Sequence, residues 1–343
     1  MAITNKYNLP QTLVDAATYN THPVAGDISV TQLIDAPQVR MLKKQVKGQL
    51  DEDITERVWA LFGTAVHNIL ERANIKDFQQ RAFLTVIAAL REYADTCVDP
   101  GDKDKLEKVA TFLFKLLPIM FPELEKRYLF ETTVRVEVNG MTVYGTFDLY
   151  DKLEKRLKDY KVCSVWNYVY PEARKKWYAQ INTYSYMVET DLGLPVLGAD
   201  IVAIFRDWSG IKVGITKDYP ERQIMEINIP IYDMSIRQQY IAKRVELHRQ
   251  AELGNVPECT GAERWAKADE WAIKTPKNKK AMRKFDDEVA AIKFKAENQH
   301  LHPNIFIELR PGSSRRCDEY CPVREICPQR KRMVTIKSDN DNE

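Results

Sequence analysis

Residues 131–161 read ETTVRVEVNGMTVYGTFDLYDKLEKRLKDYK, and they carry the strongest structural signal in the chain. Apolar and polar residues alternate on both sides of Asn139-Gly140, a dipeptide typical of a two-residue type I′ hairpin turn. Such a turn determines how its two strands pair, so that Val136 faces Val143. The residues that follow, up to Lys161, predict a third strand.

Two carboxylates, Glu131 and Asp148, fall opposite each other when this register is continued outward. Directly opposed residues share one face of a sheet, and like charges there are destabilising unless something neutralises them. Asp159 and Lys161, two apart on the third strand, also share a face. Carboxylate oxygens suit Mg²⁺ or Mn²⁺, and a lysine can stabilise charge on a phosphate. The set predicts a metal-dependent phosphodiesterase site, whereas the alternative interpretation is a group of surface salt bridges.

Two predicted helices add polar residues to this site. Gln180 and Tyr184 lie four apart on one of them, so they share a helical face. His67 lies on the other and projects away from its apolar stripe, either as a metal ligand or as a solvated histidine. Gly63, one turn before His67 and on the same side, would permit the close approach of another element.

The rest of the pattern predicts a mixed α/β chain. Its 343 residues are enough for one large or two smaller domains. Helices are expected at about 55–73, 79–94, 103–127, 171–189 and 233–252. Strands are expected at about 129–163, 199–206, 211–216 and 223–229, with a strand or short helix at 28–34. We expect a core of residues 1–255, a charged and helical C-terminal segment of residues 256–333, and a disordered tail of residues 334–343.

The composition argues against several classes of protein. The net charge is only +2, so no overall basic excess marks a nucleic-acid binder. No G-x-x-x-x-G-K phosphate loop is present, which argues against a P-loop ATPase. The chain has no apolar run long enough to span a bilayer, and its N-terminus does not read as a signal peptide. We therefore expect a cytoplasmic protein with no membrane partner.

Three cysteines are grouped near the C-terminus, at Cys317, Cys321 and Cys327, and Cys259 lies upstream. Thiols grouped in this way inside a reducing compartment are typical of metal ligands rather than of disulfides. The pattern predicts a clasp for a metal or a metal cluster.

In their order and spacing, these residues resemble the PD-(D/E)XK nuclease superfamily, and specifically its RecB-like branch. The matching pieces are Gly63-Thr-Ala-Val-His67, Glu131, Gly145-Thr-Phe-Asp148, Asp159-Tyr-Lys161 and Gln180-Ile-Asn-Thr-Tyr184. The resemblance covers most of residues 28–330. It implies a restriction-endonuclease-like core, in which helices flank a mixed central sheet, and a metal-dependent DNA nuclease.

The same resemblance implies a role for each site residue. The ligands of Mg²⁺ or Mn²⁺ would be His67, Glu131, Asp148 and Asp159. Lys161 would be catalytic together with the two aspartates, and Gln180 and Tyr184 would position the DNA or the nucleophile.

Iron–sulfur members of this branch, which include nucleases of CRISPR adaptation, carry one distant cysteine and a C-terminal trio that hold a 4Fe–4S cluster. The trio here matches, and Cys259 is the best fourth ligand. In the CRISPR-adaptation nucleases the single cysteine precedes the nuclease core, so the order here is more similar to that of phage-encoded exonucleases. Zinc is the alternative, although the uneven spacing of the trio favours iron–sulfur.

The expected function is a Mg²⁺- or Mn²⁺-dependent exonuclease in phage or bacterial DNA recombination, repair or degradation. Its partner would be DNA, single-stranded or at an end, within a bacterial cell or a phage-infected host. One alternative is a catalytically inactive iron–sulfur subunit that binds DNA or assembles a complex. Another is a redox or zinc protein that uses the cysteines alone. A helicase or recombinase partner and a homo-oligomer both stay open.

Overall fold

The computed structural model describes residues 2–18, 24–46, 51–74, 78–97, 99–120, 127–276 and 280–340. The chain divides into two compact units. Unit 1 comprises Met1–Ile34 and Gly48–Glu246, and unit 2 comprises Asp35–Lys47 and Leu247–Glu343. The division thus precedes the boundary expected at residue 255, and a short N-terminal segment belongs to unit 2.

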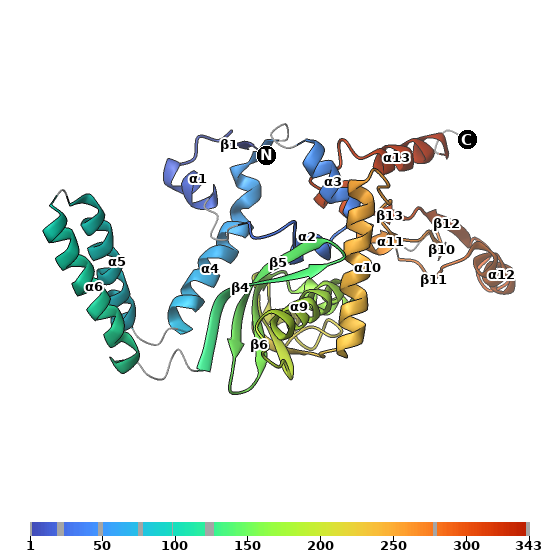
Figure 1. Cartoon of the computed structure of the whole chain (residues 1–343). Helices are drawn as coiled ribbons and strands as arrows, with labels where there is room; N and C mark the ends of the chain where they lie inside the picture. The colour runs from blue at the N-terminus through green and yellow to red at the C-terminus, as the bar shows by residue number, and fades with distance from the viewer. Residues whose placement is uncertain are drawn as a thin grey trace. The chain divides into compact units, whose positions relative to one another are not determined.

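Unit 1 is built on a six-stranded sheet with the order β2-β5-β6-β7-β8, and β4 pairs with the other edge of β5. The strands are β2 (Ile28–Ser29), β4 (Tyr128–Val138), β5 (Met141–Asp151), β6 (Arg156–Cys163), β7 (Gly198–Phe205) and β8 (Ile224–Ile229). β2 runs parallel to β5 and β6 parallel to β7, whereas the other pairs are antiparallel. A mixed sheet with helices packed against it (Figure 1) confirms the predicted fold class.

The β4–β5 hairpin has the predicted register. Val136 pairs with Val143, and the ladder begins at Val138 and Met141. Asn139 and Gly140 have φ values of +49° and +75°, as a type I′ turn requires at both central positions. The Asn-Gly signal was therefore sufficient to place the acidic residues of both strands relative to one another.

Helices of unit 1 precede, connect and follow these strands along the chain. They are α1 (Gln11–Thr18), α2 (Val30–Leu33), α4 (Val58–Asn74), α5 (Phe78–Thr96), α6 (Pro100–Met120), α8 (Trp166–Val169), α9 (Pro171–Asp191) and α10 (Met234–Glu252), with 3-10 turns η1 (Ile54–Arg57) and η2 (Gly210–Lys212). A small parallel pair joins β1 (Ala2–Thr4) to β3 (Asp51–Asp53). α9 begins with Pro171 at its first turn and packs against β4, β6 and β8, burying Ile181 and Met187. The core of unit 1 lies there.

One local prediction in unit 1 was wrong. Residues 211–216 form η2 and turns rather than a strand, because Gly214 adopts a φ of +74° that breaks the extended backbone. The apolar stripe of α4 is largely open, since Val58, Phe62 and Ile69 are 43%, 46% and 62% exposed.

Unit 2 contains more strand than expected. Its elements are α3 (Pro37–Gln45), α11 (Gly261–Arg264), β9 (Ala266–Lys267), β10 (Glu270–Lys274), β11 (Arg283–Phe285), α12 (Glu288–Asn298), β12 (Phe306–Arg310), β13 (Ser313–Ser314), the π-helical turn η3 (Arg316–Tyr320) and α13 (Pro328–Asn340). β11, β10 and β12 form a sheet that packs on α12 around Ile273 and Ala291. The prediction of a helical segment was therefore wrong for β9 to β11. α13 extends into the stretch from Val334 that was expected to be disordered.

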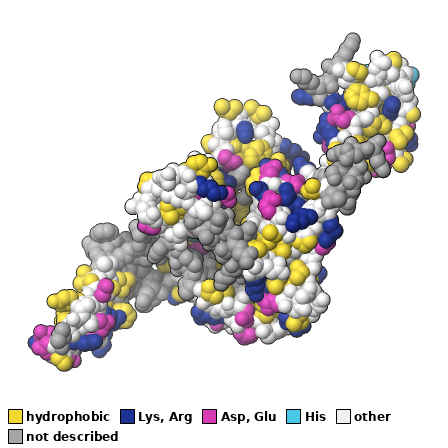
Figure 2. Space-filling view, turned by 90° about the horizontal axis from the view of Figure 1, so that it is seen from above, with side chains coloured by type: hydrophobic (Ala, Val, Ile, Leu, Met, Phe, Trp, Pro, Cys, Tyr) yellow, Lys and Arg dark blue, Asp and Glu magenta, His cyan; other side chains and the backbone are white. Residues whose placement is uncertain are grey.

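Among the helices that the structure describes, none has the length and apolar character needed to cross a membrane. Figure 2 shows Lys and Arg side chains interspersed with acidic and hydrophobic ones on the visible face, in agreement with the net charge of +2.

Candidate functional site

One edge of β5 leaves a gap between two partner strands. This edge pairs with β2 at residues 143–144 and with β6 from residue 149 onward. Gly145 begins the stretch between them, and a Cβ atom there would lie 2.7 Å from Cε1 of Tyr184. Glycine at this position therefore allows the Tyr184 ring to pack against the strand, where it reaches the acidic residues.

Asp148 ends the same gap. The β5–β6 ladder stops at Leu149 and Lys158, and Asp148 Oδ2 accepts a 2.7 Å hydrogen bond from the backbone N–H of Tyr160. A carboxylate thus takes the place of a strand as the partner of this amide. The hydrogen bond holds the Asp148 side chain in a defined orientation.

Burial raises the pKa of Asp148 to about 6, and the negative charge of Asp159 adds to the rise. Lys161 and His67 oppose it only in part. Continuing the β5–β6 register would set the two aspartates directly opposite each other, which explains their repulsion. The site is therefore electrostatically suited to an additional cation.

His67 on α4 points toward Asp148. Its Nε2 lies 2.8 Å from the carbonyl oxygen of Tyr160, and since a carbonyl can only accept, Nε2 carries the hydrogen. In the neutral ring Nδ1 then has the free lone pair, and it lies 3.7 Å from Asp148 Oδ2. Metal-binding histidines are commonly oriented by such a hydrogen bond from the second ring nitrogen.

His67, Glu131 and Asp148 each offer one ligand atom, and these atoms lie within 4.8 Å of one another. Glu131 has a φ of +40°, although Phe130 and Thr132 on either side keep the predicted pairing with β5. A left-handed conformation costs about 1–2 kcal/mol at a non-glycine residue, and such strain tends to persist at functional sites. Two carboxylates and one imidazole fit Mn²⁺ or Mg²⁺.

Lys161 forms an ion pair with Asp159, with 2.6 Å between Nζ and Oδ2. Burial alone would lower the pKa of Lys161, but the charges of Asp159 and Asp148 raise it above its ordinary value. The lysine is therefore a charged ammonium. Asp159, a predicted metal ligand, lies beside this lysine and is not one of the three grouped ligands.

Tyr184 and Gln180 come from α9. Burial, followed by the charges of Asp159 and Asp148, raises the pKa of Tyr184 far above its ordinary value, so the phenol is neutral. Gln180 hydrogen-bonds the tyrosine, and its Nε2 lies 3.5 Å from Asp159 Oδ1. The phenol is thus a positioned donor that an anionic substrate could use.

The structure brings the predicted residues of the acidic site together in unit 1; their roles stay predictions. Sequence reasoning missed Tyr160, whose backbone N–H and carbonyl orient Asp148 and His67. Its place between Asp159 and Lys161 is the signal that could have found it. At Gly63, which would permit close approach of another element, a Cβ atom would meet no described atom within 4 Å.

The four cysteines of the predicted clasp lie together in unit 2. Burial raises the pKa of Cys259 to about 12, and after Glu263 and Arg316 the next influences on it are Cys327 and Cys317. Burial also raises the pKa of Cys317, followed by the effects of Cys321 and Cys327. The thiols are therefore electrostatic neighbours.

The four sulfurs are less tightly grouped than the ligand atoms of the acidic site. Where the structure describes the chain, no three of the four thiols lie within 4.8 Å of one another. Gln329 holds the upstream cysteine in place, accepting from the N–H of Cys259 at 3.0 Å and donating to its carbonyl at 2.9 Å.

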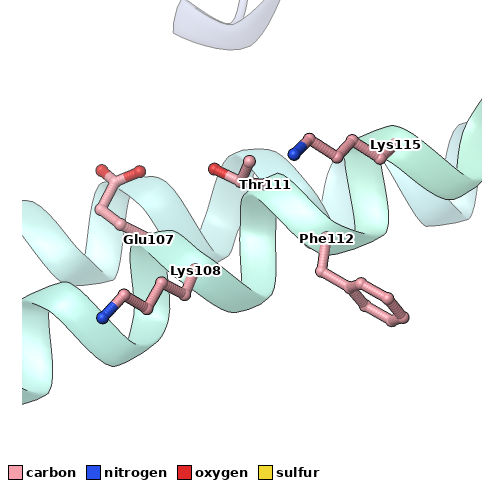
Figure 3. A pocket seen from close by; sticks show the side chains of 5 residues that line it. All are labelled: Glu107, Lys108, Thr111, Phe112 and Lys115. Carbon is pink, nitrogen blue, oxygen red and sulfur yellow. The ribbon is translucent and has the colours of Figure 1, made fainter.

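A surface hollow on α6 is lined by Glu107, Lys108, Thr111, Phe112 and Lys115 (Figure 3). All five come from one helix, and none belongs to the acidic site or to the cysteine group. The hollow therefore does not mark the functional site.

Comparison with protein families relates most of the chain to one family. The family model of the PD-(D/E)XK nuclease superfamily matches residues 41–328, a range that includes every predicted site residue. No curated protein matches the chain. A solved structure named SSO0001 is 14% identical with a TM-score of 0.37, covering 74% of this chain and 87% of that chain. A protein of Eubacterium rectale, named as a candidate exonuclease, is 13% identical with a TM-score of 0.28, covering 51% of this chain and 69% of its own.

Proposed function

The chain belongs to the PD-(D/E)XK nuclease superfamily, and on that premise we propose that it is a Mg²⁺- or Mn²⁺-dependent deoxyribonuclease of the RecB-like branch. Phage-encoded iron–sulfur exonucleases are the group it would resemble most. One observation carries the proposal, namely the grouping of His67, Glu131 and Asp148 within 4.8 Å beside the charged Lys161. The setting would be DNA recombination, repair or degradation in the cytoplasm of a bacterium or of a phage-infected cell.

Each side chain has a defined part in this proposal. A divalent ion held by His67, Glu131 and Asp148 would activate a water molecule and neutralise phosphate charge. Lys161, held by Asp159 at 2.6 Å, places a fixed positive charge where negative charge develops on the phosphate. Tyr184 donates a hydrogen bond to a phosphate oxygen and Gln180 orients it. Residues 1–255 would carry this chemistry, and residues 256–333 would carry the cluster.

The direct test is degradation of DNA that carries a label at one end. Purified protein is expected to degrade it with Mg²⁺ or Mn²⁺ and to stop when EDTA removes the metal. Single-stranded and double-stranded substrates, labelled at the 5′ or the 3′ end, would give strand preference and polarity. Protein that binds DNA but cleaves no substrate with either metal would support the inactive-subunit alternative instead.

We further propose that Cys259, Cys317, Cys321 and Cys327 hold a 4Fe–4S cluster. Support comes from their proximity, which their mutual effects on pKa indicate, and from the uneven spacing of the trio in the sequence. Buried thiols with raised pKa values are costly to ionise without a positive centre, and iron would supply one.

Replacing one of these ligands should remove the cluster. Cys321→Ser protein, prepared without oxygen, is expected to lose the brown colour and most of the iron and sulfide, which should be about four of each per wild-type chain. Cys97→Ser removes a cysteine outside the group and should keep the full content. Wild-type protein that contains zinc and no iron would contradict the assignment.

A further inference from the structure

One surface of unit 1 combines exposed and partly buried aromatic rings with cations. We call it the aromatic ledge, and it comprises Trp59, Phe62, Trp166, Tyr170, Arg206 and Lys212. Trp59 and Tyr170 are 55% and 56% exposed, which is unusually open for such large rings. In the part of the chain that the structure describes, neither Arg206 nor Lys212 forms an ion pair with a carboxylate.

The first half of the ledge is a cation stacked on a ring. The guanidinium carbon of Arg206 lies 4.3 Å from the centre of the Trp59 ring, and Phe62 packs edge-on against the same ring at 6.4 Å. Such a pair presents positive charge and an apolar face at one place.

The second half has the same chemistry. The rings of Trp166 and Tyr170 are stacked, with centroids 5.6 Å apart and planes inclined by 23°. Lys212 Nζ lies 5.1 Å from the centre of the Trp166 ring. Two aromatic surfaces, each with its own cation, therefore lie at the carboxyl ends of β6 and β7.

The ledge adjoins the acidic site. The backbone N–H of Arg206 donates to the carbonyl of Cys163 at 3.0 Å, and Cys163 is only two residues beyond Lys161. On α4, Trp59, Gly63 and His67 follow one another at intervals of four and so lie along one row of the helix surface. The row leads from the ledge to the metal ligand.

Gly63 leaves this row open. A Cβ atom there would meet no described atom within 4 Å, so packing does not require glycine. Glycine inside a helix costs about 1 kcal/mol relative to alanine, and no contact with a described residue offsets this cost at Gly63. Space for a bound molecule between Trp59 and His67 would account for it.

We propose that the aromatic ledge binds the bases of a single DNA strand and that Gly63 admits the backbone of that strand toward His67. This inference rests on the proposed nuclease function and specifies its substrate. Exposed rings stack on bases only when the bases are unpaired, and the cations beside them suit a polyanion. A duplex would present phosphates but no free base faces to the ledge.

The test is binding without cleavage. In a Lys161→Ala background with EDTA, fluorescence anisotropy would measure affinity for a labelled single-stranded oligonucleotide and for a duplex of the same length. Trp59→Ala and Tyr170→Ala should each weaken single-strand binding roughly 5- to 150-fold and change duplex binding much less. Phe112→Ala, which removes an aromatic ring of α6 that is 62% exposed, is the matched control and should bind as its parent does.

Gly63→Leu is expected to change stability and DNA binding in opposite directions. A strong helix former should raise the melting temperature if nothing packs there, while its bulk should weaken single-strand binding. A lower melting temperature would show instead that Gly63 has a structural role.

Unchanged single-strand binding in Trp59→Ala and Tyr170→Ala would refute the proposal that the aromatic ledge binds unpaired bases. An equal loss of affinity for the single strand and the duplex would refute it as well. Because binding is measured without turnover, that result would leave the nuclease proposal intact. Conversely, wild-type protein that cleaves no DNA but still binds single strands through Trp59 would refute the proposed nuclease function. It would support single-strand binding by the aromatic ledge.

Discussion

Lys161→Ala protein is expected to cleave DNA at least about 100-fold more slowly than wild type, because it loses a fixed positive charge at the phosphate. The charge is well placed for this role. Its pKa is raised by Asp159 and Asp148 despite burial, so the ammonium stays protonated across the working pH range. The measurement is the initial rate on end-labelled DNA at saturating Mn²⁺.

The same substitution leaves Asp159 without its ion-pair partner, and a stranded buried charge costs about 3–5 kcal/mol. Lys161→Gln, which can still donate a hydrogen bond, therefore accompanies it, and the melting temperature of each variant is recorded. Lys158→Ala is the matched control, since that β6 lysine pairs with Glu226 at 2.7 Å and should be dispensable. Wild-type rates from a folded Lys161→Gln protein would remove the lysine from the mechanism.

Asp148→Asn should make the metal-free protein more stable at pH 8 and insensitive to added metal. The pKa of Asp148 is about 6 in the folded protein, above the usual 3.8, so the folded state binds this proton more tightly than the unfolded state. The stabilising contribution is complete below pH 3.8 and is lost as the pH rises through 6. The loss amounts to about 3 kcal/mol above that pH.

In the wild type, a bound metal ion should offset the loss of stability that ionised Asp148 causes at high pH. At pH 8 Mn²⁺ should raise the wild-type melting temperature, since binding to the folded state alone is stabilising, and at pH 5 the effect should shrink as Asp148 takes up a proton. Asp148→Asn should show neither response and no cleavage. A Mn²⁺ shift of wild-type size in this variant would show that the metal binds elsewhere.

Asp151→Asn is a control on the same strand, because the pKa of Asp151 is shifted in the opposite direction to that of Asp148. Burial acts to raise the pKa of Asp151, but Arg127, 2.7 Å away, holds it below its ordinary value. Here ionisation stabilises the fold above the usual pKa, so removing the charge should lower the melting temperature at pH 8. Differential scanning fluorimetry at both pH values would compare the two variants directly.

Local sequence determined the β4–β5 hairpin, because Asn139 and Gly140 tolerate positive φ and the alternation on either side has a period of two residues. That register brought Glu131 to the level of Asp148. The spacing of Asp159 and Lys161 likewise follows from the strand repeat. α9 could be predicted because Pro171 opens a long segment with apolar residues on its buried face.

Contacts between distant parts of the chain depend on the tertiary structure and could not be predicted from local sequence patterns. Because the β5–β6 ladder is interrupted, the backbone N–H of Tyr160 bonds Asp148 and the carbonyl of Tyr160 bonds His67. Both contacts join residues distant in sequence. The strands β10 and β11 replace expected helix because β10 pairs with β12 more than thirty residues later. Periodicity reports which face of an element is apolar, whereas its partner depends on contacts across the fold. The sequence therefore determined which residues carry the chemistry, and the packing of α4 and α9 on the sheet decided that they meet.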